Sequence, residues 1–131
     1  MVNRNIFRET YQLFDQDVII EIINIYIDEY PGKLERLAKN IEERDFKALR
    51  FTAHNLKGVI SNFSAPEAFE MIKNFEKTAV DLFEEEGKEF NEAAIKNQLS
   101  EINATVIKVG EDLKKIKQEM LSGDFIFDPN G

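Results

Sequence analysis

The sequence contains no cysteine and no tryptophan, and among its 131 residues there are only one histidine, three prolines and six glycines. The absence of cysteine excludes disulfides, thiolate chemistry and zinc sites of the cysteine type. Hydrophobic residues make up 43% and charged residues 32%, a composition that is typical of a folded helical domain and not of a disordered chain. One domain with one core is expected at this length.

Long apolar runs and excess positive charge are missing as well. No window approaches the roughly eighteen apolar residues that a membrane span needs, and the first residues lack the continuous apolar segment of a signal peptide. With 17 basic and 25 acidic residues, the formal net charge is -8, so the phosphate-neutralising charge of nucleic-acid binders is absent. We expect a cytoplasmic protein that binds neither nucleic acid nor membranes.

Apolar residues recur every three or four positions in four long segments, which is the period of one helix face. The last segment is roughly 45 Å long at about 1.5 Å per residue. Strand signals are weak, because the β-branched runs also satisfy the helical period. The segments cover approximately residues 17–44, 46–63, 66–82 and 91–121.

Prolines and capping residues set the expected ends of these helices. Pro31, inside the first segment, predicts a kink near Tyr30 or a break into two collinear helices, because proline removes a hydrogen bond and crowds the preceding turn. Asp45 is expected to cap the second segment. Ser64 and Glu67 are expected to form a capping box at the start of the third segment.

Short connections between successive helices favour antiparallel neighbours. The sequence therefore predicts an all-α fold, an antiparallel up-down-up-down four-helix bundle with a short extra helix at about residues 5–14. Residues 1–121 form the expected bundle domain. We expect the tail, residues 122–131, to be flexible or to form a strap across the bundle. A monomer is expected, since one bundle accommodates the apolar stripes.

The single histidine, His54, is predicted to point outward from the second segment. On a helical wheel its direction lies about 130° from the centre of the core stripe. Phe51 falls almost opposite that stripe, which is an unusual place for a large aromatic side chain. The other neighbours within about 60° of His54 are small or polar; they are Lys47, Arg50, Lys57, Gly58 and Ser61.

This surrounding favours chemistry at the imidazole over a bystander role. An imidazole has an ordinary pKa of about 6.5, so its neutral, nucleophilic form is abundant near pH 7. A phosphoryl group on the ring would bring roughly two negative charges, and Lys57, one turn further on, has the reach to pair with them. Gly58 costs about 1 kcal/mol of helix propensity relative to alanine, which calls for a reason such as the close approach of another surface.

The stretch Ala53-His54-Asn55-Leu56-Lys57-Gly58 resembles the A-H-x-L-K-G motif of histidine-containing phosphotransfer (HPt) domains, the shuttles of phosphorelays. The similarity extends over most of the chain and includes an acidic, aromatic helix with a proline, the short "ERDF" turn and Phe75-Glu76 on the following helix. One position departs from the family, because Ser64 stands where a second glycine is usual. That departure puts the shape of the helix end and the fit of a partner in question.

The resemblance implies that His54 accepts the phosphoryl group, that Lys57 neutralises it and that Gly58 makes space. The partners it implies are response-regulator receiver domains and a hybrid sensor histidine kinase, with Mg²⁺ on the receiver and no cofactor or metal on this chain. The function it implies is a phosphorelay intermediate, a phosphocarrier without autokinase activity. The residues expected to contact the partner are Lys47, Arg50, Phe51, Asn55, Gly58 and Ser61.

Other functions find less support in the sequence. No glycine-rich nucleotide lid is visible for a kinase, no Glu-x-x-His pair for a metal bundle, and no partnered nucleophile for a hydrolase. The open alternative is a helical protein–protein adaptor or inhibitor module of a signalling pathway that passes no phosphate. The presence of both His54 and Lys57 argues against it.

Overall fold

The computed structural model describes residues 1–125 and is all-helical over that part of the chain, as predicted. Each helix carries buried apolar residues on the side that faces the others, and the short η1 contributes one, Phe63. None of the described helices is long and apolar enough to cross a membrane. In chain order the elements are α1 (Arg4–Tyr11), α2 (Gln16–Glu42), α3 (Phe46–Ile60), the 3₁₀ turn η1 (Ser61–Phe63), α4 (Pro66–Glu84) and α5 (Glu92–Ser122).

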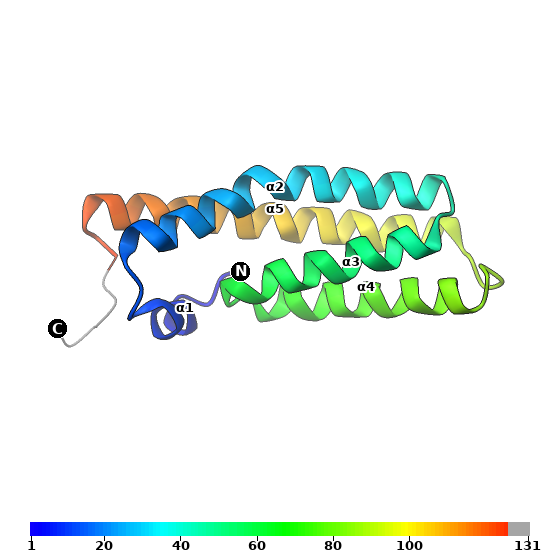
Figure 1. Cartoon of the computed structure of the whole chain (residues 1–131), viewed down its shortest axis with the longest axis horizontal. Coiled ribbons are helices and arrows are strands. Elements are labelled where there is room, and N and C mark those ends of the chain that lie inside the picture. The colour runs from blue at the N-terminus through cyan, green and yellow to red at the C-terminus, as the bar shows by residue number, and fades with distance from the viewer. Residues whose placement is uncertain (126–131) are drawn as a thin grey trace.

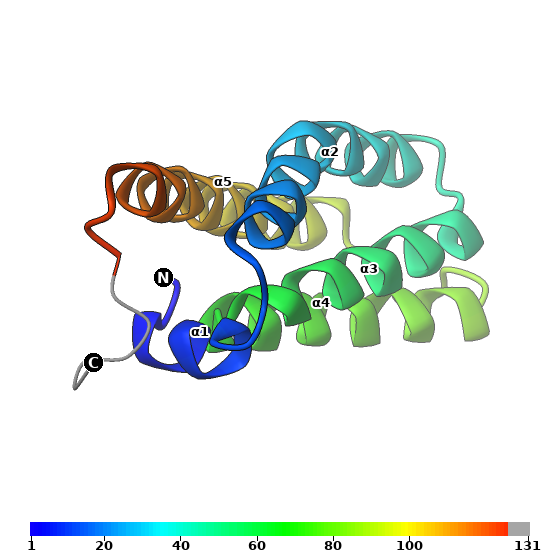
Figure 2. The ribbon, with the colours of Figure 1, turned by 60° about the vertical axis from the view of Figure 1, so that its left-hand side comes forward.

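The four longer helices lie side by side along the long axis of the molecule (Figure 1). Each of them contacts the next one along the chain, and α5 also contacts α2. Figure 2 shows α2 and α5 as one pair and α3 and α4 as the other, with α1 against one end. Their apolar faces enclose one shared core, whose largest fully buried side chains include Tyr26, Phe7, Phe63 and Phe75.

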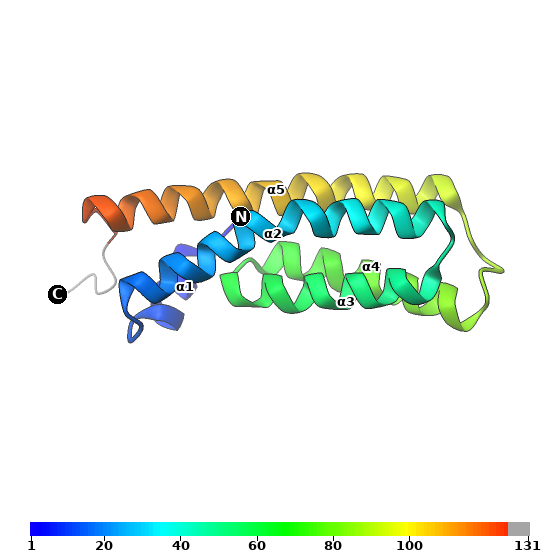
Figure 3. The same ribbon diagram turned by 45° about the horizontal axis from the view of Figure 1, so that its top comes forward.

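The proline in α2 bends the helix without breaking it. The helix runs unbroken over Gln16–Glu42 with Pro31 inside it, so of the two predicted outcomes, a kink or a break, the break is wrong. Figures 1 and 3 show the ribbon of α2 changing direction near its middle, which is the expected effect of a lost internal hydrogen bond. Packing on both sides of the bend, from Ile23 to Leu37, maintains the helix through the defect.

The end of the histidine helix differs from the prediction. The regular helix stops at Ile60, and η1 carries the chain on to Ser64, which adopts a left-handed backbone with φ of 54°. Ala65 then precedes α4 without a side-chain cap, so the predicted capping box is wrong. The left-handed turn places Ser64 outside the N-cap position that such a box requires. The same left-handed backbone is a physical reason for the glycine that the HPt pattern usually has at the position of Ser64, since glycine adopts this conformation most easily.

The N-terminal helix is shorter than expected, ending at Tyr11, and covers the end of the bundle. The Tyr11 hydroxyl donates to the carbonyl of Asn62 at 2.7 Å, which ties α1 to η1. Phe7 meets the ring of Phe125 edge-on at 5.9 Å, and Phe125 is buried. The first residues after α5 therefore pack on α1, while the predicted flexible or strap-like remainder of the tail, residues 126–131, lies outside the described residues.

Candidate functional site

His54 on α3 faces solvent because the opposite face of this helix is buried in the core. Asp45 caps the helix as predicted, its carboxylate accepting from the backbone N–H of Ala48 at 3.0 Å. The buried face consists of small and branched side chains at helical spacing, Leu49, Thr52, Ala53, Leu56 and Ile60. The side chain of His54 is 70% exposed, which confirms its predicted outward direction.

A carboxylate from the neighbouring helix holds the imidazole. His54 Nδ1 lies 2.7 Å from Oε1 of Glu76 on α4. The other oxygen of the same carboxylate, Oε2, lies 2.7 Å from Nζ of Lys57. Glu76 thus binds two neighbouring α3 side chains with its two oxygens, and only 14% of its own side chain is exposed.

This arrangement fixes the orientation and the tautomer of the ring. An ionised carboxylate can only accept hydrogen bonds. The neutral ring therefore carries its proton on Nδ1, and this N–H donates a hydrogen bond to Glu76. The lone pair of His54 is then on Nε2. Since Nδ1 is occupied and most of the side chain is exposed, Nε2 is the nitrogen available to an incoming electrophile.

Lys57 and His54 together keep the Glu76 carboxyl ionised. Partial burial by itself raises the pKa of the Glu76 carboxyl, but the hydrogen bonds from Lys57 and from His54 together outweigh that effect. The pKa of Glu76 is therefore below its ordinary value. At neutral pH the group is a carboxylate, as the assignment of the histidine tautomer requires.

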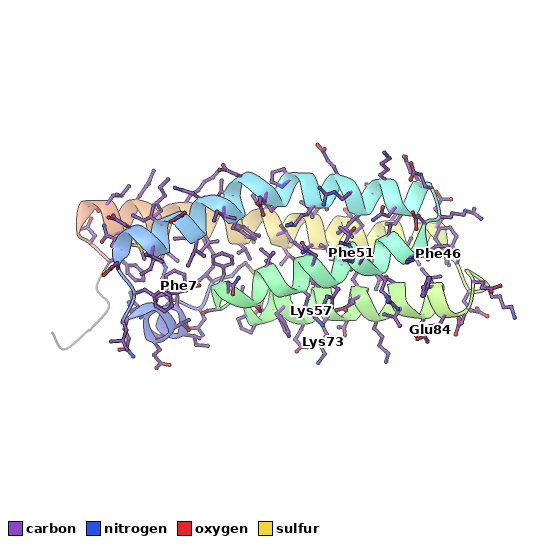
Figure 4. All side chains as sticks on the ribbon, viewed as in Figure 1. Phe7, Phe46, Phe51, Lys57, Lys73 and Glu84 are labelled. Atoms are coloured by element: carbon purple, nitrogen blue, oxygen red, sulfur yellow. The ribbon has the colours of Figure 1, made fainter. Side chains whose placement is uncertain are left out.

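An open hollow of about 360 Å³ lies beside the histidine, between α3 and α4. Phe51 is 72% exposed at its edge, as predicted, and Figure 4 shows it on α3 with Lys57 further along the same helix. Arg50 places its guanidinium 5.0 Å from the centre of the Phe83 ring, which steadies the cation at the rim. The hollow is lined by Lys47, Arg50, Phe51, His54, Glu76 and Val80.

The remaining predicted site residues do not line the hollow. Asn55, the partly exposed Lys57 and Gly58 lie on α3, and the exposed Ser61 is the first residue of η1. A Cβ atom built on Gly58 would meet nothing within 4 Å, so the fold itself does not require a glycine there. The Ser61 hydroxyl donates to the carbonyl of Gly58 at 2.6 Å and is therefore turned toward its own helix. Asn55 is exposed.

Sequence reasoning did not assign a role to Glu76, Val80 or Phe83. Glu76 follows the buried Phe75 and stands four residues after the buried Ile72, so it borders the core stripe of α4. An acidic side chain at the edge of the core is seldom buried without a basic or hydrogen-bonding partner, so its position indicates that such a partner lies nearby. The spacing within α4 could not name that partner, because the register between α3 and α4 is set by tertiary packing.

Comparison with protein-family models matches residues 21–105 to the Hpt domain, a span of about two-thirds of the chain. Comparisons with curated proteins and with solved structures gave no match. The matched span includes the histidine helix and the carboxylate that holds its ring. The chain belongs to the Hpt-domain family, whose members are histidine phosphotransfer modules of two-component phosphorelays.

Proposed function

We propose that this protein is a phosphorelay intermediate that accepts a phosphoryl group on His54 from the phospho-aspartate of a receiver domain and passes it to another receiver aspartate. The observation that carries the proposal is the exposed imidazole whose Nδ1 is bound by Glu76 at 2.7 Å, leaving Nε2 for reaction. The fold we assign to it is the antiparallel up-down-up-down bundle, supported by the contacts between successive helices.

The transfer step is an in-line displacement at phosphorus. The Nε2 lone pair of His54 attacks, the Nε2–P bond forms, and the bond between phosphorus and the aspartate oxygen breaks with its electron pair returning to the carboxylate. The proton on Nδ1 stays in the hydrogen bond to Glu76. The second transfer is the same step in reverse, because phosphoryl transfer depends mainly on positioning and charge stabilisation.

The face around His54 suits an acidic receiver pocket. Lys47 and Arg50 supply positive charge at the hollow on a chain whose net charge is -8, which favours approach of an acidic partner in this orientation. Phe51 offers an exposed apolar contact. Gly58 leaves room for the partner to come close, and Asn55 and Ser61 extend the same face.

Lys57 and the expected metal have separate places in this scheme. Lys57 lies one turn from His54 and is the proposed cation for the transferred group, although in this structure it pairs with Glu76. Mg²⁺ is expected on the receiver and not on this chain. We further propose that the chain does not phosphorylate itself and works in the cytoplasm with a hybrid sensor kinase upstream, in keeping with its family. We also propose that it acts as a monomer, since one bundle accommodates its apolar stripes.

The test is transfer from a radiolabelled, phosphorylated receiver to the purified protein, repeated over the receivers of the source organism. Label on this chain that is acid-labile and alkali-stable, and that is absent from His54→Gln, is the expected result. Label retained by His54→Gln would overturn the proposed chemistry. Receiver binding without any label would instead favour a helical adaptor or inhibitor module.

A further inference from the structure

Glu76 contacts both groups whose behaviour decides how firmly a phosphoryl group would be held. One carboxylate oxygen binds the ring nitrogen opposite the proposed reacting nitrogen, and the other binds Lys57. From this geometry, and building on the proposed function, we propose that Glu76 is a positioning residue that makes phospho-His54 short-lived and ready to transfer. It does so by keeping the phosphorylated ring protonated and by restraining Lys57.

The first part of the argument concerns the proton on Nδ1. Once the Nε2–P bond has formed, a ring that keeps its Nδ1 proton is an imidazolium. When the N–P bond later breaks, its electron pair returns to Nε2 and the leaving group is neutral imidazole. Without that proton the leaving group would be an imidazolide anion, which is far less stable. A carboxylate 2.7 Å from Nδ1 stabilises the protonated ring, and so favours departure of the phosphoryl group.

The second part concerns Lys57. A phosphoryl group carries about 1.5 to 2 negative charges near neutral pH, and an adjacent ammonium would stabilise it. Lys57 can turn fully to that group only by leaving Glu76 Oε2, to which it is bound at 2.7 Å. Glu76 would then remain partly buried with one partner fewer, which is unfavourable. The existing ion pair therefore weakens the hold of Lys57 on the phosphoryl group.

The other charged side chains at the hollow would lengthen the lifetime of phospho-His54, which is opposite to the proposed effect of Glu76. Lys47 and Arg50 from α3 line the hollow beside His54, and among the described side chains that line it Glu76 is the only acidic one. Cations near the ring disfavour its protonation and stabilise an attached phosphoryl group. Without Glu76, the described surroundings of His54 would favour retention of phosphate.

The experiment loads His54 with phosphoramidate, a small donor that needs no receiver, and follows loss of phosphohistidine by ³¹P NMR between pH 5 and 9. The key variant is Glu76→Gln, because its amide oxygen can still accept from Nδ1 while its negative charge is gone. Glu84→Gln is the matched control. Glu84 is the last residue of α4 and lies well away from Lys57 in Figure 4. Circular dichroism and urea unfolding establish that each variant is folded.

The expected result is that phospho-His54 in Glu76→Gln persists about threefold to tenfold longer near pH 7 than in the wild type. The pH midpoint of the loss should also fall, because a lower pH is needed to protonate the ring once the carboxylate is gone. Glu84→Gln should match the wild type in both respects. A longer lifetime with an unchanged midpoint would overturn the proton part of the proposal and leave only the restraint on Lys57.

Equal lifetimes and midpoints in the wild type and Glu76→Gln would overturn the whole role of Glu76. That result would leave transfer from receivers untouched, so the two proposals fail separately. Conversely, a Glu76 effect on chemically loaded protein that accepts nothing from any receiver would contradict the proposed function alone. Failure of phosphoramidate to load the wild-type histidine would contradict the exposed Nε2 on which both depend.

Discussion

We predict that Gly58 lowers the free energy of unfolding and, in return, leaves space for the partner beside His54. It lies in the last turn of α3, one turn beyond His54, and a Cβ built there meets nothing within 4 Å. Its φ lies outside the range from +20° to +160°, so its backbone is one that any residue can adopt. Replacing it by a longer side chain should therefore improve the helix while obstructing the surface beside the histidine.

The sizes of the two effects follow from helix propensity and helix geometry. Gly58→Ala should raise the free energy of unfolding by about 1 kcal/mol, and Gly58→Gln by about 0.5 kcal/mol. Residues four apart on a helix have Cβ atoms about 5–6 Å apart, so a glutamine side chain can reach the space next to the imidazole. We expect transfer to slow only modestly in Gly58→Ala and by about tenfold or more in Gly58→Gln.

The assay combines urea unfolding, followed by circular dichroism, with single-turnover transfer from a phosphorylated receiver. Chemical loading by phosphoramidate provides the control, because a small donor should be nearly indifferent to the added side chain. The expected signature is a more stable protein that is slower with receivers and normal with phosphoramidate. A less stable Gly58→Gln, or one that transfers at the wild-type rate, would refute the idea that this glycine provides clearance.

Three further predictions concern stability. Ser64→Gly should raise the free energy of unfolding by about 0.5–1 kcal/mol, since Ser64 has φ of 54° and glycine adopts that backbone more easily; a loss of stability in urea would contradict this. Thr52→Val should cost about 1–3 kcal/mol, because it removes the acceptor 3.0 Å from the buried Asn40 amide, whereas Thr52→Ser should cost less than Thr52→Val. The lowered pKa of Glu76, where hydrogen bonds from Lys57 and His54 outweigh partial burial, implies stability that is present above the ordinary carboxyl pKa of about 4.3 and lost as the pH falls below it. In urea titrations at pH values of about 4.3 and below, the free energy of unfolding should fall less steeply with decreasing pH in Glu76→Gln than in the wild type. Equal slopes in the two proteins would contradict the lowered pKa of Glu76.

Helix positions were predictable from the sequence because they depend on local period and composition. The core stripe of α5, from Ile95 to Met120, is buried as its spacing requires, and the exposure of His54 follows from the same arithmetic on α3. The family resemblance also depends on residues adjacent in sequence, and the family match supports it. These features need no knowledge of how one helix sits against another.

Features that depend on the packing of two elements were missed. The bond between His54 and Glu76 joins residues 22 positions apart and exists only at one register of α3 against α4. Ser64 predicts a cap because serine is a common capping residue, but the turn between two packed helices gives it a left-handed backbone instead. Pro31 predicts either a kink or a break, and core contacts on both sides of the bend decide for the kink, because they keep α2 continuous.

The central claim is that a receiver delivers its phosphoryl group to Nε2 of His54. The most direct measurement is ³¹P and ¹⁵N NMR of protein with ¹⁵N-labelled histidine, after incubation with a phosphorylated receiver. Because Nδ1 is bound by Glu76, the account predicts a single phosphohistidine signal coupled to Nε2. Phosphorus on Nδ1, on any other residue, or on no residue of this chain would contradict it.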